Sequence, residues 1–444
     1  MNKEFQKKQN FFSFSDIDSE RKDRIMKFTS TEATPAPHVP PGVLRLTGAA
    51  KEDIPMYRIQ TMNKISPVGL NRFPSELYEV GDAVQDPQGI LVRSAKLLNL
   101  EFNPGLLAIA RAGVGVNNIP LDRCAAAGIP VFSTPGANAN AVKELVICAM
   151  LMGSRDIPGA IRWVREQAAS GVDVSTVVEK GKSAFIGPEL YKKTLGIIGL
   201  GAIGSIVANT AISLGMDVYG YDPFLSVDTA LRLDRHVHVV KDINDLYKRS
   251  DYITMHIHYT EKTAHMIDAD AIAAMKRGVR VINLARGEIV DDEAMLTALD
   301  TGMVAAYITD FPNNRLLTAP HVIAMPHLGA STPESEQNCA AMAVDTLRDY
   351  LESGNIRSSV NLPEMTMDRS GVQRLCVLHK NVPGMLANIT SLFGRDGVNV
   401  ENLSNKSRGD YAYTMVDLGS KVGDNVIEDV RRTANVIRVR SLEW

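Results

Sequence analysis

The sequence predicts an α/β protein with two doubly wound parallel sheets and a smaller ferredoxin-like unit at the C-terminus. From Tyr57 onward, short apolar segments alternate with helical ones, an order typical of parallel sheets wrapped by helices. Residues 374–442 change to a βαββαβ pattern, which is typical of a ferredoxin-like unit. The chain has 444 residues, too many for one hydrophobic core. We therefore expect several domains.

The first alternating block contains four predicted strands and one short helix. The helix covers residues 121–127 and ends at Gly128, because glycine suits the residue after a helix. A longer helical stretch, residues 139–168, follows and is interrupted near Pro158. The strands are predicted at residues 57–62, 89–94, 106–112 and 130–134.

The second block opens with an apolar strand at residues 194–200 and closes with a long helix. We predict that Ser331 caps this helix, that Pro333 lies near its first position, and that it ends at Gly354. The other strands of this block are predicted at residues 217–222, 252–256, 280–284, 304–309 and 322–325.

A composition break at residues 362–371 precedes the third pattern. Its elements give the order βαββαβ. The strands are predicted at residues 374–379, 398–403, 411–418 and 436–442, and the helices at residues 385–393 and 426–434.

Composition and charge exclude several classes of function. Hydrophobic residues make up 45% of the chain and charged residues 22%, as in ordinary soluble proteins. The net charge of -3 gives no electrostatic reason to expect nucleic acid or an anionic membrane as a partner. No apolar run approaches the ~18–20 residues of a membrane span. The four cysteines form no CxxC pair, so we expect no metal site and reduced thiols in a cytoplasmic protein.

Residues 1–55 differ from the rest of the chain. They are polar and rich in lysine, and residues 35–41 are rich in proline. Such a segment buries little apolar surface, so we predict a flexible N-terminal extension. A transit peptide is the alternative, but acidic residues such as Glu4 and Asp16 are unusual in one.

A glycine-rich turn predicts a dinucleotide site. Gly199, Gly201 and Gly204 follow a strand directly and open a helix, which is the context that this motif requires. The glycines allow the tight turn, the approach of a pyrophosphate and close helix packing. The helix N-terminus, at Ala202 and Ile203, offers free N–H groups to phosphates.

The next strand ends in Asp222, 18 residues after Gly204. A carboxylate there can accept hydrogen bonds from ribose hydroxyls and repels a 2′-phosphate, so we predict NAD rather than NADP. The alternative is that the glycines serve packing alone and that Asp222 is a turn residue.

Two strand ends hold the candidate catalytic groups. Residues 281–291 form an apolar strand ending in Arg286, and residues 326–332 place His327 at another strand end. In an open parallel sheet, ligands bind at the carboxyl ends of strands. The arginine fork suits a carboxylate, and the histidine suits a proton transfer near neutral pH. Taken singly, the alternatives are a structural histidine and a solvated arginine.

The motifs together resemble the D-isomer-specific 2-hydroxyacid dehydrogenases. The resemblance rests on residues 283–291, residues 326–332 and the Gly199 turn, and it covers residues 57–362. Residues 111–119 are similar to the substrate loop of that family, and Asn138 with Glu144 matches its crossover helix. The resemblance implies a substrate domain in two parts, residues 56–138 and 340–362, with an NAD domain, residues 139–339, inserted between them.

The resemblance also implies roles for individual residues. Arg286 would bind the substrate carboxylate, and His327 would transfer the proton. The remaining residues would bind either the cofactor or the substrate, and Arg93 is the candidate for an anionic substrate tail. The further cofactor residues are His256, Ala285 and Asp310, and the substrate residues are Arg93, Ser94, Val114, Gly115 and Asn138.

The sequence departs from the family pattern at two positions. The family places a glutamate shortly after the strand that ends near Asp310, but Asn314 occupies roughly that position here. A paired carboxylate stabilises an imidazolium, so without one we expect His327 to be less basic and keto-acid reduction to decline at a lower pH. His258 stands where the family commonly has proline, and we interpret it as structural.

Residues 373–444 resemble an ACT domain, a regulatory module that binds small amino acids. His379, Asn381 and Asn399 match positions that hold L-serine in serine-inhibited members. The alternative is a domain that serves dimerisation alone. An ACT domain on this family implies the branch that oxidises D-3-phosphoglycerate with NAD, the first step of L-serine biosynthesis. The family also implies a homodimer or homotetramer.

Two rival functions stay open at this point. The first is action on another 2-hydroxy acid, such as reduction of glyoxylate or hydroxypyruvate. The second is a non-catalytic NAD-sensing protein on the same scaffold, which the missing glutamate favours and the presence of Arg286 and His327 disfavours.

Overall fold

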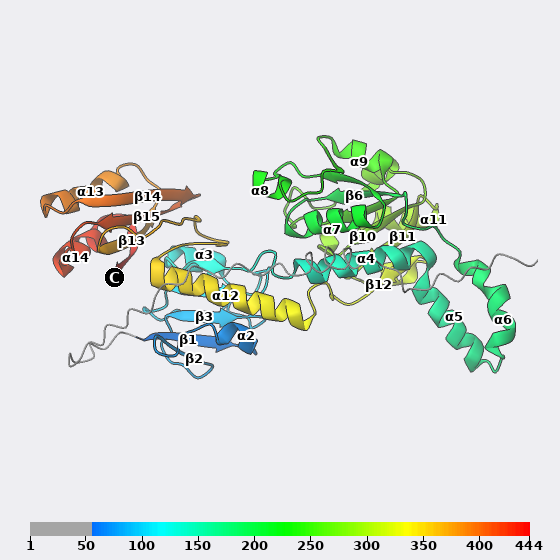
Figure 1. The fold of residues 1–444 in the computed structure, drawn as a ribbon, viewed down its shortest axis with the longest axis horizontal. Coiled ribbons are helices and arrows are strands. Elements are labelled where there is room, and N and C mark those ends of the chain that lie inside the picture. The colour runs from blue at the N-terminus through cyan, green and yellow to red at the C-terminus, as the bar shows by residue number, and fades with distance from the viewer. Residues whose placement is uncertain (1–55) are drawn as a thin grey trace, which may run out of the picture. The chain divides into compact units, whose positions relative to one another are not determined.

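Three sheets organise the residues that the structure describes, 56–444 of the computed structural model (Figure 1). Two of the sheets are parallel and the third is antiparallel. The predicted fold class is confirmed at this level. The predicted N-terminal extension, residues 1–55, lies outside the described residues.

The first parallel sheet has five strands in the order β2-β1-β3-β4-β5. Chain order reverses between β1 and β3, and this reversal defines the switch point of a doubly wound sheet. The elements of this part are β1 (Tyr57–Met62), α2 (Pro67–Leu70), β2 (Tyr78–Gly81), β3 (Gly89–Val92), β4 (Ala108–Arg111), α3 (Leu121–Ala126) and β5 (Val131–Phe132).

The second parallel sheet has seven strands in the order β12-β11-β10-β9-β6-β7-β8. Its switch point lies between β6 and β9. The strands are β6 (Thr194–Ile198), β7 (Asp217–Tyr221), β8 (Val237–Val240), β9 (Tyr252–Met255), β10 (Val279–Asn283), β11 (Val304–Thr309) and β12 (Val322–Ala324). The helices are α4 (Ala139–Arg155), α5 (Ile157–Ala169), α6 (Val174–Gly181), α7 (Ala202–Ser213), α8 (Val227–Ala230), α9 (Ile243–Arg249), α10 (Ala269–Ala273), α11 (Asp292–Asp300) and α12 (Pro333–Ser353), with 3₁₀ turns η1 (Lys182–Phe185), η2 (Gly287–Ile289) and η3 (Leu316–Thr318).

The third sheet is antiparallel, in the order β14-β15-β13-β16. Its elements follow one another as βαββαβ, as the sequence predicts. They are β13 (Gln373–Lys380), α13 (Met385–Arg395), β14 (Val400–Arg408), β15 (Tyr411–Leu418), α14 (Asp424–Arg432) and β16 (Val436–Glu443).

Both faces of the seven-stranded sheet are covered by helices. On one face, Val146 of α4 and Val207 of α7 join one buried apolar cluster. On the other face, Leu246 of α9 and Met295 of α11 join a second cluster. Successive strand residues alternate between the two clusters because strand side chains have a period of two. This double burial explains why the strands read as continuous apolar runs.

Helix α12 returns the chain to the first sheet. Its buried residues from Cys339 to Leu351 share one apolar cluster with Ile59 and Leu91 of β1 and β3. The close contact at Gly69 of α2 explains the glycine there, since a Cβ would lie 2.7 Å from the Cβ of Ala340. The packing supports a substrate domain built from two distant parts of the chain.

The predicted cap of α12 is wrong by one residue. Thr332, not Ser331, is the N-cap, and its hydroxyl oxygen accepts the backbone N–H of Ser335 at 3.1 Å. Proline then occupies the first helical position, Pro333, where no N–H is needed. The predicted end is confirmed, because Gly354 adopts a positive φ of 76° after Ser353.

Some elements escaped sequence analysis. β2 and β8 are edge strands in which one residue at most is buried, so they lack an apolar run. The predicted break near Pro158 is confirmed, although the residue that breaks the helix is Asp156, at φ 40°. Its side chain then caps α5 by accepting the N–H of Gly159.

A buried ion pair joins the third sheet to the end of α12. Arg374 and Asp417 form two hydrogen bonds, of 2.6 and 2.7 Å, and both side chains are inaccessible to solvent. The other guanidinium hydrogen atoms reach the carbonyl oxygens of Ser353, Met367 and Asp368 at 2.8–2.9 Å. All five donors of this arginine are therefore satisfied.

The third sheet also shares its apolar core with the first. Leu378, Tyr413 and Met415 lie in the same cluster as the buried face of α12, and the opposite face packs on α13 and α14. The Tyr413 hydroxyl donates to the Gly354 carbonyl at 2.6 Å. The C-terminal unit is thus packed against α12 and the five-stranded sheet. Within residues 56–444, no helix is long and apolar enough to cross a membrane.

Breaking the buried pair should destabilise the protein strongly. Arg374→Met leaves Asp417 charged, buried and unpaired, which should lower the free energy of unfolding by about 3–5 kcal/mol. Combining it with Asp417→Leu should restore much of that loss. Urea unfolding measures both effects.

The matched control is Arg431→Met, which breaks the exposed pair with Glu428 in the same unit and should change stability by less than about 1 kcal/mol. Equal losses for Arg374→Met and Arg431→Met would contradict the anchoring role.

Candidate active site

The Gly199 turn has the geometry of a dinucleotide cradle. Gly199 has a φ of 90°, which favours glycine. A Cβ at Gly204 would lie 1.9 Å from the Gly199 carbonyl oxygen, so this position needs close backbone contact. A Cβ at Gly201 would meet nothing within 4 Å, so the space in front of the turn is open. The N-terminus of α7, at Ala202 and Ile203, has no side-chain cap and offers its N–H groups to an anion.

Asp222 is held beside this turn at the end of β7. One carboxylate oxygen accepts the N–H of Leu200 at 2.9 Å, and the other accepts the N–H of Phe224 at 2.9 Å. These bonds fix the carboxylate next to the glycine turn. This placement supports the predicted contact with a ribose.

His256 follows β9 on the other side of the switch point. Its carbonyl oxygen would lie 2.6 Å from a Cβ at Gly199, which places His256 against the turn. Burial lowers the pKa of His256 to about 4, so the ring is neutral at physiological pH. Its Nε2 lies 3.2 Å from the Thr254 hydroxyl.

The loop after β10 holds Arg286 in a defined position. Asn283, fully buried at the end of β10, donates to the Arg286 carbonyl at 2.8 Å and accepts the N–H of Ala285 at 3.2 Å. The Arg286 guanidinium donates to the Ala285 carbonyl at 2.6 Å. Both predicted residues of this loop, Ala285 and Arg286, are therefore oriented by an asparagine that sequence analysis did not single out.

Two guanidinium groups flank Gly115 of the predicted substrate loop. A Cβ at Gly115 would lie 3.2 Å from Nη1 of Arg111 and 3.3 Å from Nη2 of Arg286. Arg111 ends β4 and donates through Nε to the Arg93 carbonyl at 2.8 Å. Burial lowers the pKa of Arg111, and the like charge of Arg286 lowers it further. Both groups remain charged at neutral pH.

Neither guanidinium is neutralised within residues 56–444. The ion pairs of this part of the chain include neither Arg111 nor Arg286. Two half-buried like charges without a counter-ion repel each other and favour an anion between them. The structure therefore brings the predicted Arg286 and Gly115 together with Arg111, which the sequence analysis did not assign.

Arg93 and Ser94 follow β3, at the switch point of the first sheet. Arg93 forms an ion pair with Glu336 of α12 at 2.5 Å, and both side chains are partly exposed. The N–H of Ser94 donates to the Asn63 side chain at 3.0 Å. Arg93 lies beside Arg111, because Nε of Arg111 donates to the Arg93 carbonyl. The charge of Arg93, unlike that of Arg111, is already paired with Glu336.

The other two predicted substrate residues lie in the substrate loop and at the start of α4. Val114 is half-buried between Gly113 and Gly115. Asn138 is the N-cap residue of α4, and its side-chain oxygen is buried with no hydrogen-bond partner among the described residues. Both stay candidates for substrate contact.

His327 is exposed on the loop after β12. Its ring lies 4.6 Å from the ring of Phe311, at 48°. Phe311 also has the Arg286 guanidinium 5.7 Å from its ring centroid. Phe311 therefore contacts both predicted catalytic residues, and no signal in the sequence pointed to it. The predicted cofactor residue Asp310 precedes it and is buried.

The three predicted regulatory residues of the C-terminal unit differ in exposure. His379 is buried, and its ring nitrogens lie 2.8 Å from the Lys380 carbonyl and 2.8 Å from the Thr414 hydroxyl. Asn381 and Asn399 are exposed. The three share no hydrogen bond with one another. The Asn381 amide donates to the Gly409 carbonyl at 3.1 Å, and the Asn399 amide donates to Glu401 at 3.0 Å.

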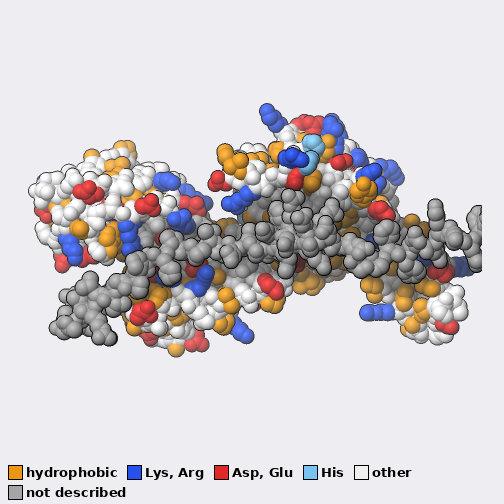
Figure 2. All heavy atoms as spheres, viewed as in Figure 1, with side chains coloured by type: hydrophobic (Ala, Val, Ile, Leu, Met, Phe, Trp, Pro, Cys, Tyr) orange, Lys and Arg blue, Asp and Glu red, His pale blue; other side chains and the backbone are white. Residues whose placement is uncertain are grey.

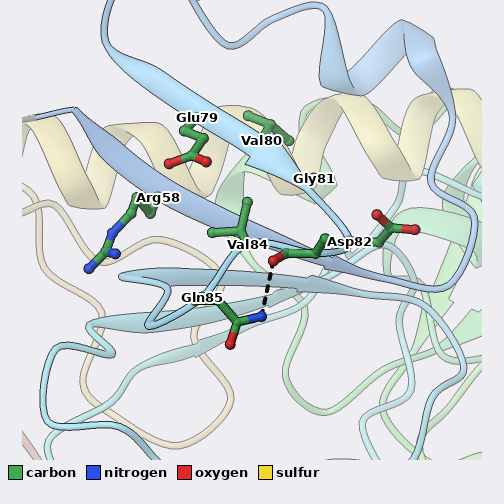
Figure 3. Close-up of a pocket in the computed structure, with 8 residues that line it drawn as sticks. Arg58, Glu79, Val80, Gly81, Asp82, Val84 and Gln85 are labelled. Atoms are coloured by element: carbon green, nitrogen blue, oxygen red, sulfur yellow. Dashed lines mark hydrogen bonds between the residues drawn. The ribbon is translucent and has the colours of Figure 1, made fainter.

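Two open pockets are lined by other parts of the two parallel sheets and their loops. One, of about 390 Å³, is lined by β1 and the segment from β2 to Gln85 (Figure 3). Figure 3 shows Arg58 and Glu79 beside it, and Gln85 bonded to the Ala83 carbonyl at 3.1 Å. The other, of about 510 Å³, is lined by acidic residues of α11 and by Phe311. Within the described chain, no group of three histidine, cysteine or carboxylate residues could hold a metal.

The two doubly wound sheets and the groups at their strand ends are typical of a dinucleotide-dependent oxidoreductase. A family model, D-isomer specific 2-hydroxyacid dehydrogenase, NAD binding domain, matches residues 147–329. A D-3-phosphoglycerate dehydrogenase of Escherichia coli K12 is 33% identical over 380 residues, which cover 82% of this chain and 89% of the relative. The chain belongs to the D-isomer-specific 2-hydroxyacid dehydrogenase family.

The matches to other relatives cover a smaller share of the relative's length. A D-3-phosphoglycerate dehydrogenase of Synechocystis is 36% identical over 326 residues, and this match spans 71% of the chain but only 56% of the relative. Among solved structures, the NAD⁺-bound 3-phosphoglycerate dehydrogenase of Entamoeba histolytica matches 69% of this chain and 99% of its own, with 25% identity and a TM-score of 0.54.

Removing the carboxylate beside the glycine turn should change cofactor preference. Asp222→Ala should weaken NADH binding at least about tenfold relative to NADPH, because the ribose loses an acceptor and the 2′-phosphate loses a repelling charge. Fluorescence titration with each nucleotide measures the ratio. Asp228→Ala, at an exposed position of α8, is the matched control. An unchanged ratio in Asp222→Ala would rule out the ribose contact.

Proposed function

We propose that the chain catalyses the NAD-dependent oxidation of D-3-phosphoglycerate to 3-phosphohydroxypyruvate. The observation that carries this proposal is the pair of guanidinium groups, Arg111 and Arg286, on either side of Gly115, neither of which forms an ion pair within the described chain. The substrate carries a carboxylate and a phosphate, so it needs more positive charge than an ordinary 2-hydroxy acid. The names of the relatives support the same substrate.

The strand-end residues supply the chemistry around the reacting carbon. Arg286 holds the carboxylate through its planar fork, and the amides of Val114 and Gly115 contact it from the substrate loop. His327 accepts the hydroxyl proton in the oxidation and donates it in the reverse direction. Bound NAD supplies the hydride acceptor. Gly199, Gly201, Gly204 and Asp222 would hold its pyrophosphate and ribose.

The phosphate is assigned to the cations of the substrate domain. Arg93 is the candidate for this group, together with Arg111. Glu336 now pairs with Arg93 at 2.5 Å, and an exposed ion pair of this kind is weak enough to be exchanged for a phosphate. This assignment places the two anionic ends of the substrate on different arginines.

The domain division that follows from this proposal has three parts. Residues 56–138 and 340–362 form the substrate domain, residues 139–339 the NAD domain, and residues 373–444 a regulatory domain. The shared apolar cluster of α12 with β1 and β3 supports the first of these.

A comparison of substrates tests the proposal. Oxidation of NADH with 3-phosphohydroxypyruvate should be rapid, and its kcat/KM should exceed that for hydroxypyruvate or glyoxylate at least about tenfold, as an extra paired charge implies. His327→Ala should lower kcat by about 100- to 10,000-fold and leave NADH binding intact.

Each rival function predicts a different result in this assay. A higher kcat/KM for glyoxylate or hydroxypyruvate would move the chain to another 2-hydroxy acid. No turnover with any keto acid, despite tight NADH binding, would make it an NAD-sensing protein.

We also propose that the C-terminal unit is an ACT domain with L-serine as its effector. Its βαββαβ order supports this assignment. Asn381 and Asn399 would contact the amino acid through their exposed amides, while His379 has both ring nitrogens engaged and would position the neighbouring backbone. A domain that serves assembly alone is the alternative.

Serine inhibition of the full chain tests the regulatory role. L-serine should inhibit the enzyme, and Asn381→Ala should raise the half-inhibiting concentration about tenfold, as the loss of a hydrogen bond to a charged ligand implies. Asn425→Ala, exposed on α14, should behave as the wild type. Calorimetry that detects no serine binding would favour the assembly role.

A homodimer or homotetramer is proposed for the assembly. Helices α5 and α6 contain no buried residue and expose Ile161, Val164 and Val178. Figure 2 shows hydrophobic side chains on the arm formed by α5 and α6, at the lower right of the view. An apolar arm of this kind is typical of an interface between subunits.

A further inference from the structure

The loop that follows β3 carries Arg93, the candidate for the substrate phosphate. This β3 loop, residues 93–97, has no regular secondary structure, so its backbone groups need hydrogen-bond partners elsewhere. Nε of Arg111 donates to the Arg93 carbonyl at 2.8 Å. The side-chain amide of Asn118 donates to the Ala95 carbonyl at 2.7 Å. Both donors belong to the substrate loop, which therefore holds two carbonyl groups of the β3 loop.

The N–H groups at the start of the β3 loop have a different partner. Oδ1 of Asn63, the first residue after β1, accepts the N–H of Ser94 at 3.0 Å and the N–H of Ala95 at 2.5 Å. The sheet order places β1 beside β3, and chain order reverses between these two strands. Asn63 therefore lies at the switch point of the first sheet, where open α/β sheets bind their ligands.

The backbone of Asn63 makes this arrangement informative. Its φ is 73°, a conformation that asparagine tolerates better than most residues but that glycine adopts without cost. An asparagine in a turn commonly bonds to backbone groups two residues away. Here Oδ1 instead bonds to N–H groups that are 31 and 32 residues away. A glycine would serve the turn after β1 equally well, so the asparagine side chain has a role beyond this turn.

Positive charges gather on the two loops that Asn63 joins. Lys64 lies on the loop after β1, and Lys96 lies with Arg93 on the β3 loop. Both lysines are exposed, and neither forms an ion pair among the described residues. Like charges repel, which opposes the close approach of the loops. The neutral oxygen of Asn63 holds the loops together without cancelling the positive charge that a phosphate needs.

We propose that Asn63 is a positioning residue that sets the preference of the enzyme for a phosphorylated substrate. It fixes the N–H groups of Ser94 and Ala95, and this fixes the direction in which the Arg93 side chain leaves the β3 loop. The proposal rests on the proposed function, in which Arg93 binds the phosphate. Asn63 acts through the loop and not on the reacting carbon, so its loss should affect substrate binding far more than the chemical step.

The first experiment removes the acceptor and keeps the backbone conformation, because glycine adopts a positive φ freely. In Asn63→Gly, the β3 loop gains freedom that it must lose again when the phosphate binds. The KM for 3-phosphohydroxypyruvate should therefore rise about tenfold, as the loss of two hydrogen bonds implies, while kcat should change little. Both constants for hydroxypyruvate, which has no phosphate, should stay near their wild-type values. Steady-state assays of NADH oxidation by the full chain measure them all.

Asn435→Gly is the matched control. Asn435 also has a positive φ, of 71°, and is exposed in the C-terminal unit, so the same substitution is made in the same backbone conformation. It should leave every constant unchanged. In Asn63→Gly, equal rises in KM for both keto acids, or a fall in kcat alone, would indicate a merely structural role and overturn the proposal. An unchanged KM for 3-phosphohydroxypyruvate would overturn it as well.

The second experiment measures amide hydrogen exchange in the full chain and needs no turnover. Ser94 is exposed and lies outside every helix and strand, so only its bond to Asn63 slows its exchange. The neighbouring N–H of Lys96 donates to no described residue and serves as the internal reference. In the wild type, the Ser94 and Ala95 amides should exchange at least about tenfold more slowly than the Lys96 amide. Equal rates would refute the clamp, even if Asn63→Gly fails to fold.

The two experiments separate this inference from the proposed function. Slow exchange at Ser94 and Ala95 in a wild-type protein that does not prefer the phosphorylated keto acid would retain the clamp and reject the proposed substrate. A wild-type preference for the phosphorylated keto acid that persists in Asn63→Gly would retain the substrate and reject the role of Asn63.

Discussion

The charge of Arg111 and Arg286, which no carboxylate within residues 56–444 pairs with, is the constraint on which the site depends. Two guanidinium groups within reach of one glycine repel each other, and the fold must hold them there. Asn283 anchors the loop of one, and the Arg93 carbonyl anchors the other. Each anchor comes from a different parallel sheet. The site is therefore a product of two sheets whose carboxyl ends bring the two guanidinium groups to Gly115.

Much of this arrangement was predictable because it depends on local pattern. Strand ends, the Gly199 turn and Asp222 have fixed chain spacings, and parallel sheets place such ends at a common edge. The edge strands β2 and β8 were missed because half-exposed strands carry little apolar periodicity. The cap of α12 was misplaced because Ser331 and Thr332 are chemically equivalent caps, and only backbone geometry separates them.

The missed site residues share a different property. Arg111 and Phe311 act through contacts with residues far away in the chain, and a single sequence does not show such contacts. Asn283 acts locally, on Ala285 and Arg286, through bonds that the apolar pattern of β10 does not reveal. The family resemblance assigned Asp310 to the cofactor, but its bond to Gly329 and its second oxygen, which has no partner among the described residues, appear only in three dimensions.

The hydrogen bonds of the Arg374 guanidinium restrict how the C-terminal unit can be exchanged between proteins. Because its donors reach α12, the following segment and β15 at once, the C-terminal unit cannot be grafted onto another enzyme as an independent cassette. A chimeric protein must include the last turn of α12 and residues 367–368 together with the C-terminal unit. Otherwise the buried guanidinium of Arg374 loses hydrogen-bond acceptors. The C-terminal unit and the end of α12 therefore behave as one structural piece.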